Sequence, residues 1–454
     1  MLAANTGRTW RPLGVNSVGS VMAIAVVTAL IAPRTTLAIL IVLVMLLYAS
    51  VASVDVRDTS RLMPPIIAAL SIFAVYLLLS SIWAAAPLST IYIAAIGFAT
   101  LLVSWAATVG LALLSPLRCQ KLANALLIGF SIGLAFLMIE ELTDDWIKLW
   151  FLNNLPFVQR NPKHMVLRDA EILNLASYLN NRSIALASLL LWPMLGMLAA
   201  LRPSGVPWVW RGAASVAIVG LAIVTIVKSQ HETSALAVAL GAVVFLVARF
   251  RQRLGAALVG FGWVVAVVFV IPLANFAYDS LQLQRAESLP FSARARIVIW
   301  KYTASEVVNS PLIGVGAGST ERLDNNRASY ETPTGDPVAL RTMRHAHNIY
   351  LQVWYELGVI GAALLVLIGA SVIGAASRLR PQAQPYAFAA FATIAAMGAT
   401  SWSPWQEWFM AAFALTGLCC WLVDRMVVGN NPQSLDRETD VLASTSLSSA
   451  AAVQ

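Results

Sequence analysis

The feature that most constrains this chain is a succession of apolar runs, most of them long enough to cross the roughly 30 Å hydrocarbon core of a bilayer as a helix. The composition agrees, because 59% of the 454 residues are hydrophobic and only 11% are charged, unlike a soluble domain. We therefore predict an all-α polytopic membrane protein with about 12 transmembrane helices. The runs lie near Val18 to Ala32, Thr36 to Ala52, Pro65 to Ile82, Ile91 to Leu114, Leu122 to Leu142, Ser183 to Ala200, Ala213 to Val227, Ala235 to Phe250, Ala256 to Phe276, Ile349 to Ala376, Tyr386 to Ser401 and Phe409 to Val427.

Lysine and arginine residues gather in every second short loop between these runs, for example Arg57 with Arg61 and Arg118 with Lys121. The positive-inside rule places such loops in the cytoplasm. Both termini are then cytoplasmic, and the first run is a retained helix, because no small-residue cleavage site follows it. The net charge of +8 is mostly this topology signal, so no nucleic-acid partner is expected.

Two longer loops, residues 143–182 and 277–346, lie on the predicted outer side. Long loops cross the membrane regardless of their charge, so the basic residues in them do not contradict the topology. They indicate where polar function is concentrated. We thus predict a membrane domain over 1–428, with helices in the large loop between spans 9 and 10, and a disordered cytoplasmic tail over 429–454.

Two of the four histidines, His345 and His347, lie with Arg341 and Arg344 directly before the tenth run. A helix N-terminus there offers unpaired N–H groups and a positive field, which together with the arginines would keep the His347 imidazole neutral. His347 could then accept a proton while the cations hold a diphosphate. The alternative is an interfacial histidine that only caps the helix. Two histidines with no third ligand apparent predict no metal site.

The large loop also contains ARARIVIWKYTASEVVNSP, which predicts a helix of about four turns that starts near Ala293 and stops before Pro311. Arg296 and Trp300 are four residues apart and therefore share one face. A guanidinium beside an indole suits a phosphate or a sugar. Equally, the helix could lie on the membrane with an interfacial tryptophan and a solvated arginine.

Gly314, Gly316 and Gly318 follow this helix. A nucleotide site is disfavoured, because neither a preceding strand nor a Walker lysine is present. We predict a turn in which backbone closely approaches backbone or ligand. Glu356 lies within the tenth span and is a functional candidate for that reason. Nine positions place it nearly opposite His347 on a helix, so we favour a structural role bonded to neighbouring helices.

In the first long loop, Arg168 and Arg182 are candidate cations. Arg182 opens the sixth run and would sit at the depth of a lipid diphosphate. Its alternative interpretation is a snorkelling anchor at the membrane interface.

Together these residues resemble the signature shared by bacterial O-antigen ligases and related lipid-linked glycan polymerases and transferases. The resemblance is strongest from Arg294 to Gly361. The pattern is arginine, three residues, tryptophan, then Pro-x-x-Gly-x-Gly-x-Gly, and finally His-Asn-x-x-Leu. The matching positions are Arg296, Trp300, Pro311, Gly314, Gly316, Gly318, His347, Asn348 and Leu351.

The resemblance implies a glycosyltransferase of the bacterial inner membrane with a periplasmic active site. It implies transfer of a glycan from undecaprenyl diphosphate to a hydroxyl of the lipid A core, without metal or cofactor and with inversion at the anomeric carbon. His347 would be the general base, and Arg296 would hold the departing diphosphate. Further candidates for binding the diphosphate or the glycan are Arg168, Arg182, Trp300, Arg341, Arg344 and Asn348.

One departure from the family pattern concerns the span that begins near Ser234. Family members commonly have a Ser-Arg pair there, and this chain reads KSQHETSALA instead. Another cation, such as Lys228, would have to take over the work of the arginine. His231 is a weaker substitute, because its charge at neutral pH is uncertain.

The motif does not separate a ligase from an O-antigen polymerase, whose acceptor is another lipid-linked glycan, or from a protein O-oligosaccharyltransferase, whose acceptor is a serine or threonine. We favour the ligase, because the chain has ordinary ligase length and no extra soluble domain after the last span. A non-catalytic flippase or transporter is the alternative from a different class. It is disfavoured, because the halves show no repeat and the polar groups concentrate in two loops rather than at the midplane.

Overall fold

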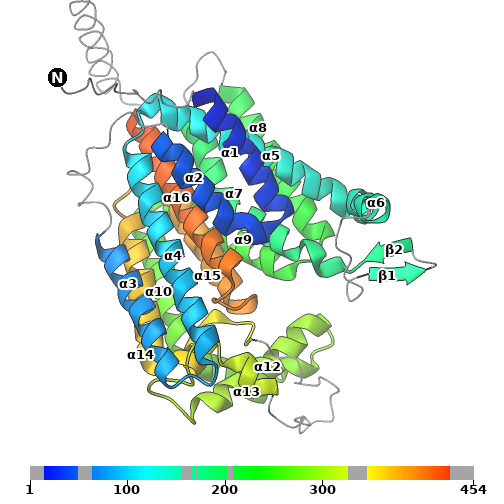
Figure 1. Cartoon of the computed structure of the whole chain (residues 1–454), viewed down its shortest axis with the longest axis vertical. Helices are drawn as coiled ribbons and strands as arrows, with labels where there is room; N and C mark the ends of the chain where they lie inside the picture. Colours follow the sequence, from blue (N-terminus) through cyan, green and yellow to red (C-terminus); the bar gives the residue numbers. More distant parts are fainter. Residues whose placement is uncertain are drawn as a thin grey trace, which may run out of the picture.

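The computed structural model of this chain describes residues 15–49, 64–155, 165–168, 171–201, 208–325 and 345–429. This part of the chain is helical apart from one antiparallel hairpin, β1 and β2 (Figure 1). The predicted all-α polytopic class is therefore confirmed, with the hairpin in the first long loop as an unpredicted addition. The elements are α1 (Val15–Ile31), α2 (Thr36–Ala49), α3 (Pro64–Leu79), α4 (Pro87–Ala112), α5 (Pro116–Leu142), α6 (Trp146–Asn154), β1 (Met165–Arg168), β2 (Glu171–Leu175), α7 (Asn181–Ala200), α8 (Trp208–Lys228), α9 (Glu232–Phe250), α10 (Gln252–Val268), α11 (Val270–Asn275), α12 (Phe291–Val307), α13 (Thr320–Asn325), α14 (Ile349–Ala376), α15 (Gln384–Thr400) and α16 (Glu407–Gly429).

The predicted number of membrane spans is not confirmed by the described part of the chain. Each predicted run largely coincides with a helix, but among the described residues only eight helices are long and apolar enough to cross a membrane. A ninth is obtained if α10 and the segment Val270–Ser280, bent by 72° from it, form one span. The helices α1 and α2 are apolar but shorter. The count of 12 is thus not confirmed, because hydropathy locates apolar runs more reliably than it measures the length of a helix.

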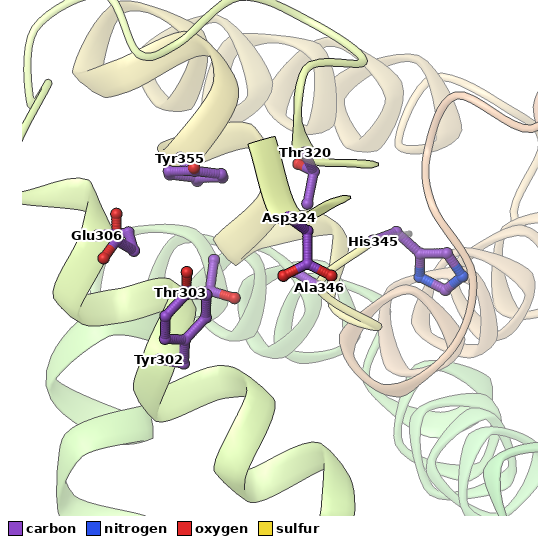
Figure 2. Close-up of a pocket in the computed structure, with 8 residues that line it drawn as sticks. All are labelled: Tyr302, Thr303, Glu306, Thr320, Asp324, His345, Ala346 and Tyr355. Carbon is purple, nitrogen blue, oxygen red and sulfur yellow. The ribbon is translucent and has the colours of Figure 1, made fainter. Parts of the chain in front are cut away.

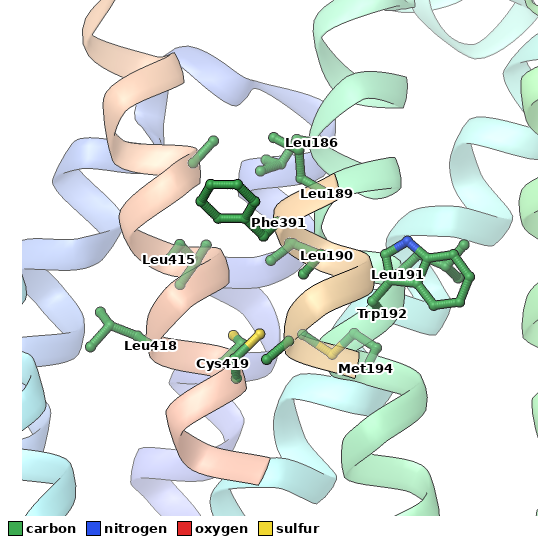
Figure 3. Close-up of a cluster of buried hydrophobic side chains, with 14 of the residues drawn as sticks. Leu186, Leu189, Leu190, Leu191, Trp192, Met194, Phe391, Leu415, Leu418 and Cys419 are labelled. Carbon is green, nitrogen blue, oxygen red and sulfur yellow. The ribbon is translucent and has the colours of Figure 1, made fainter. Parts of the chain in front are cut away.

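Helix α7 forms the centre of the bundle. The span that contains it is 89% buried, and α5, α8, α15 and α16 pack around it. Figure 3 shows Leu189 and Leu190 of α7 beside Phe391 of α15 and Leu415 of α16, all in one hydrophobic core. A helix enclosed in this way has no face left for lipid, whereas α9 exposes large apolar side chains such as Phe250. The arrangement is that of a membrane bundle with an inner and an outer layer of helices.

The polar residues of interest gather at one end of this bundle. Helices α12 and α13 lie there, at the bottom of Figure 1, and α12 packs against α11 and α14. The four-turn helix predicted from near Ala293 is confirmed by α12, which ends at Val307. The N-terminus of α14 at Ile349 also coincides with the predicted start of the tenth span. The predicted tail and residues 326–344 lie outside the described residues.

Candidate active site

Arg296 lies on α12 and is held near the N-terminal end of α9. Buried residues such as Ile297 fix α12 against the bundle, and Ser292 at its start donates a hydrogen bond to Glu232 Oε2 at 3.4 Å. Burial lowers the pKa of the Arg296 guanidinium, and the Glu232 carboxylate opposes that effect. Arginine stays protonated in proteins, so Arg296 supplies a permanent positive charge. That charge acts on His347, so the structure brings the two predicted catalytic residues together.

His347 lies two residues before the first residue of α14 and has a left-handed backbone, with φ of +51°. The following residue, Asn348, is the N-cap of the helix. Its side-chain oxygen accepts hydrogen bonds from the N–H groups of Tyr350 at 3.0 Å and Leu351 at 3.1 Å. Because Asn348 is the N-cap and accepts from two N–H groups of the first turn, the interpretation of His347 as a helix cap is wrong. The predicted role of Asn348 in substrate binding has to be compatible with this capping.

The His347 imidazole is neutral at neutral pH. Burial lowers its pKa to about 4, and the positive charge of Arg296 acts in the same direction. The ring also donates a hydrogen bond to the backbone carbonyl of Ser401. This bond occupies one ring nitrogen as a donor and leaves the other as an acceptor. The sequence prediction of a neutral imidazole holds, although burial is the larger cause.

His231 is a second histidine beside Arg296. It is buried at the start of α9, and burial together with the charge of Arg296 lowers its pKa to about 4. Its Nδ1 lies 2.7 Å from Ser234 Oγ. Lys228, the other residue considered as a replacement for the family arginine, is exposed at the end of α8. His231 therefore adds a neutral hydrogen-bonding group next to Arg296, and it does not replace a positive charge.

The connection between α15 and α16, residues 401–406, contacts both histidines. Ser401 accepts the hydrogen bond from His347, and the Trp402 ring lies 5.6 Å from the His231 ring, measured between centroids. Sequence reasoning does not single out this segment. The sequence pattern that could have identified this segment is SWSPWQEW, in which polar residues and three tryptophans lie between two apolar spans.

Trp300 shares a face of α12 with Arg296, as predicted, but it is only partly exposed. It packs against the main hydrophobic core. Its indole N–H is buried and has no hydrogen-bond partner within the described part of the chain. A buried donor without a partner is uncommon in proteins. A role for Trp300 in binding a ligand stays a prediction.

Arg182 lies in the first turn of α7, and Arg296 is not among the charged groups that act on it. The charged side chain close enough to affect it is Arg34, which belongs to the turn Pro33–Thr35 between α1 and α2 and repels it. Within the described segments, the buried Nε of Arg182 has no hydrogen-bond partner. The binding role of Arg182 is therefore still a prediction, and the cation next to it is Arg34 rather than Arg296.

The predicted cation Arg168 is in β1, and its side chain is not among those described, whereas Arg341 and Arg344 lie outside the described residues altogether.

Asn180, two residues before Arg182, has a structural role. Its side-chain N–H groups donate to Glu141 at 2.7 Å and to Asp145 at 2.8 Å, which fixes the start of α7 against the end of α5.

The three glycines after α12 form a tight turn with positive φ at Gly314, Gly316 and Gly318. Their loop packs into a break in α14 at Gly358, where φ is +63° and ψ is −162°. A Cβ added to Gly314 would lie 2.3 Å from the carbonyl carbon of Glu356. The prediction of a turn with close backbone approach is confirmed, and the partner is the broken helix.

The loop and the break satisfy each other's backbone groups. The Gly316 N–H donates to the carbonyl of Glu356 at 2.8 Å, and the Val359 N–H donates to the carbonyl of Pro311 at 2.9 Å. A break in a spanning helix frees such groups, and they must find partners inside the protein. The glycine motif thus compensates for the kink in α14.

Glu356 is fully buried and anchors the same loop. Its carboxylate accepts hydrogen bonds from the N–H of Gly318 at 2.8 Å, from the N–H and hydroxyl of Thr320 at 3.1 and 2.5 Å, and from the indole of Trp405. The structural role favoured for Glu356 is confirmed, although its partners lie in the glycine loop, at the start of α13 and in the connection between α15 and α16 rather than along neighbouring spans. These hydrogen bonds fix the position of α13 and of the preceding turn relative to α14.

The fold and this site define a multi-pass helical membrane protein with a cation and two neutral histidines at one end of its bundle. Residues 217–366 match the family model described as O-antigen ligase. This range includes α9, α12, the glycine loop and His347. The resemblance found in the sequence is therefore confirmed over the part of the chain that carries His231, Arg296 and His347, whereas the connection at residues 401–406 lies outside the matched range.

Relatives point in the same direction. A protein of Rickettsia bellii named "Putative polysaccharide ligase" is 31% identical over 142 residues, which is 30% of this chain and 34% of the relative. Proteins of Rickettsia conorii and Rickettsia typhi with names of the same kind are each 26% identical over 144 residues, 31% of this chain and 34% of the relative. The chain thus spans about a third of the length of the curated relatives it matches.

Proposed function

We propose that this protein is a glycan ligase of the bacterial inner membrane. It would transfer a glycan from undecaprenyl diphosphate to a hydroxyl of the lipid A core, at a periplasmic site. The observation that carries the proposal is the pairing of His347 and Arg296: a neutral imidazole with one free nitrogen lies within electrostatic reach of a permanent cation. The family match and the names of the relatives support the same class of reaction.

The proposed reaction is a single displacement at the anomeric carbon. The free nitrogen of His347 takes the proton of the acceptor hydroxyl while the acceptor oxygen forms its bond to the anomeric carbon. The bond from that carbon to the diphosphate oxygen breaks, and the electron pair leaves with the diphosphate. Arg296 stabilises the negative charge that develops there. Attack from the side opposite the leaving group inverts the anomeric configuration.

The hydrogen bond from His347 to Ser401 has a defined part in this scheme. It fixes the tautomer and the orientation of the ring, so the basic nitrogen does not exchange roles with the other one. The low pKa means that the base is almost completely unprotonated at neutral pH. It also makes the free imidazole a weak base, and the arriving diphosphate would raise its proton affinity by its negative charge.

The test is transfer of glycan from undecaprenyl diphosphate to lipid A core by the purified full-length protein. We expect His347→Ala to lower the rate by about 10²- to 10⁴-fold, the usual contribution of a general base, and added imidazole to restore part of it. Lys301→Gln, which changes another cation of α12 paired with Asp279, is the matched control. A fully active His347→Ala would refute the base assignment. Transfer only to a second lipid-linked glycan would make the protein a polymerase, and transfer only to a peptide hydroxyl would make it a protein O-oligosaccharyltransferase.

A further inference from the structure

His231 lies beside Arg296 and takes no part in the scheme above. Its ring is buried at the start of α9, and burial together with the positive charge of Arg296 lowers its pKa and keeps it neutral. We propose that His231 is a second binding residue for the lipid diphosphate and donates a hydrogen bond from Nε2–H to a phosphate oxygen beside the Arg296 guanidinium. This inference rests on the proposed function.

The tautomer of His231 follows from its contact with Ser234. The Nδ1 atom of the ring lies 2.7 Å from the Ser234 hydroxyl oxygen, so one of the two atoms donates to the other. Ser234 is completely buried, and its hydroxyl has no other hydrogen-bond partner in the described part of the chain. If Nδ1 carried the proton, the buried O–H would have no acceptor, which is rare in folded proteins. The hydroxyl therefore donates to Nδ1, and the single proton of the neutral ring is on Nε2.

The two histidines near Arg296 thus have opposite hydrogen-bonding capacities. His347 donates to the backbone carbonyl of Ser401, so its second ring nitrogen is an acceptor and can take a proton. In His231 the acceptor nitrogen is already used by Ser234, and the second nitrogen is a donor. His231 cannot act as the general base without losing its bond to Ser234. An N–H donor instead suits an oxyanion such as a phosphate oxygen.

The charges around Arg296 show what a neutral donor adds to the site. The exposed Glu232 carboxylate favours the positive charge of Arg296, and it would repel an arriving phosphate. A second cation at the position of His231 would be repelled by Arg296, whereas a neutral N–H group avoids that repulsion and still bonds the phosphate. Taking a diphosphate out of water is costly unless several donors converge on it.

The His231 ring is held in place by the connection between α15 and α16. The Trp402 ring lies 5.6 Å from it, measured between centroids, and Trp402 packs edge-on against Trp408 at 4.9 Å. Thr400, the last residue of α15, donates a hydrogen bond to the hydroxyl of Thr233, the second residue of α9. A binding group held by such contacts loses little conformational freedom when the ligand arrives.

A pocket next to the proposed base is excluded as the diphosphate site by its size. Figure 2 shows this pocket between α12, α13 and the residues just before α14, with His345 in its lining. The His345 ring lies 4.0 Å from the His347 ring, measured between centroids. The pocket has room for about one water molecule, and neither Arg296 nor His231 is among its lining residues. It is therefore too small to hold a diphosphate.

The tautomer is tested directly by nitrogen-15 NMR of the full-length protein in nanodiscs, with labelled histidine. The protonated and the unprotonated ring nitrogen have clearly different chemical shifts, and the signals that disappear in His231→Gln belong to His231. We expect His231 to carry its proton on Nε2 in the wild-type protein. A proton on Nδ1 would overturn the inference, because Nε2 would then have no hydrogen to donate.

Lipid binding is tested by native mass spectrometry of the full-length protein, with undecaprenyl diphosphate as the probe and uncharged undecaprenol as the reference. We expect His231→Leu to weaken binding of the diphosphate about tenfold or more, the effect of losing a hydrogen bond to a charged group. Binding of undecaprenol should be unchanged. His231→Gln should bind the diphosphate within about threefold of wild type, because its amide N–H takes the place of Nε2–H.

Two further variants complete the binding experiment. Gln230→Asn changes the adjacent exposed residue, whose φ of +54° asparagine tolerates, and it should bind as wild type does. If His231→Leu does not fold, as judged by thermal unfolding, His231→Asn replaces it with the same expectation, because its shorter amide does not reach the position of Nε2. Equal binding of the diphosphate by wild type and by the folded variant would refute the role of His231.

Transfer kinetics separate this inference from the proposed function. His231→Gln should retain glycan transfer and His347→Gln should lose it by about 10²- to 10⁴-fold, because glutamine can donate a hydrogen bond but cannot act as a base. His231→Leu should raise KM for the lipid-linked glycan and leave KM for the acceptor unchanged. If wild type transfers glycan and His231→Leu has the same KM for the lipid-linked glycan, the inference fails while the ligase proposal stands. If wild type transfers nothing, the ligase proposal fails, and the role of His231 fails with it.

Discussion

Glu356 and Arg296 are two charged residues at the same end of the bundle, and their surroundings are opposite. The Glu356 carboxylate is fully buried and receives hydrogen bonds from the glycine loop, from Thr320 and from Trp405. The Arg296 guanidinium is partly buried and forms no hydrogen bond with the described part of the chain; Glu232 favours its charge without bonding to it, and two of its neighbours are neutral histidines. A charge that finds its partners inside the protein serves the fold. A charge that lacks them is suited to a partner from outside.

The largest effect that can break this comparison is expected at Glu356. Glu356→Leu would leave several buried N–H and O–H donors without an acceptor, each at a cost of about 1–3 kcal/mol. We expect the variant to accumulate poorly or to unfold at a much lower temperature, measured by thermal unfolding in detergent. Glu287→Leu, at an exposed position before α12, should change stability by less than about 0.5 kcal/mol. A Glu356→Leu protein of normal stability would contradict the anchoring role.

Arg296 should give the reverse result. Arg296→Gln removes the cation from the proposed diphosphate site, so we expect transfer to fall about a hundredfold or more, as for other groups that stabilise a developing anion. Thermal stability should be unchanged or slightly higher, because the variant no longer holds a partly buried charge without a hydrogen-bond partner. The measurement is glycan transfer beside thermal unfolding of the same preparation. Equal loss of stability and activity would make Arg296 structural and remove the contrast with Glu356.

The sequence predicted much of this end of the molecule because the relevant signals are local. The α12 helix, the start of α14 and the close backbone approach at Gly314 all follow from spacing and residue type. The kink at Gly358 did not, because this apolar run contains four glycines and nothing in their spacing marks the one at which the helix breaks. The position of His231 beside Arg296 also depends on how α9 packs near α12, which no local pattern encodes.

Local patterns also could not predict the position of Arg182, the hairpin or the number of spans. Arg182 was expected to serve the diphosphate, and the structure places it near Arg34 of a different turn. Long-range pairing of this kind is set by tertiary packing. The hairpin in the first long loop is only two short strands, Met165–Arg168 and Glu171–Leu175, too short to give a periodic signal. The 12 predicted spans are not confirmed because several apolar runs coincide, among the described residues, with helices that are short or bent.

A moderate effect should distinguish the glycine loop from ordinary glycines of the bundle. Gly314 has φ of +66° and no room for a Cβ beside Glu356, so Gly314→Ala should lower the free energy of unfolding by about 1–3 kcal/mol or more. Gly220 of α8 has no atom within 4 Å of a built Cβ, so Gly220→Ala should be neutral or gain up to about 1 kcal/mol. Thermal unfolding of the two variants provides the comparison. Equal stabilities would show that the loop adapts and does not depend on its glycines.

The smallest effect concerns the titration of His347. Its pKa of about 4 lies below the ordinary value near 6.5, so the free protein should keep this imidazole neutral as the pH falls from 8 to about 5. Since kcat/KM reports ionisations of the free enzyme, it should not decline near pH 6.5 through this residue. The acid limb should appear only as the pH approaches the lowered pKa.

The titration also tests the cause of the shift. With only four histidines in the chain, labelled imidazole signals can be assigned and followed by NMR. Arg296→Gln should raise the pKa of His347, because a nearby positive charge opposes protonation. The pKa should nevertheless stay below the ordinary value, since burial is the larger cause. A wild-type His347 that titrates near pH 6.5 would mean that water reaches the ring freely. The base would then resemble a surface histidine. Only Arg296 would then distinguish the proposed substrate site, which has no bonded partner for its charge, from Glu356, whose carboxylate is already hydrogen-bonded inside the protein.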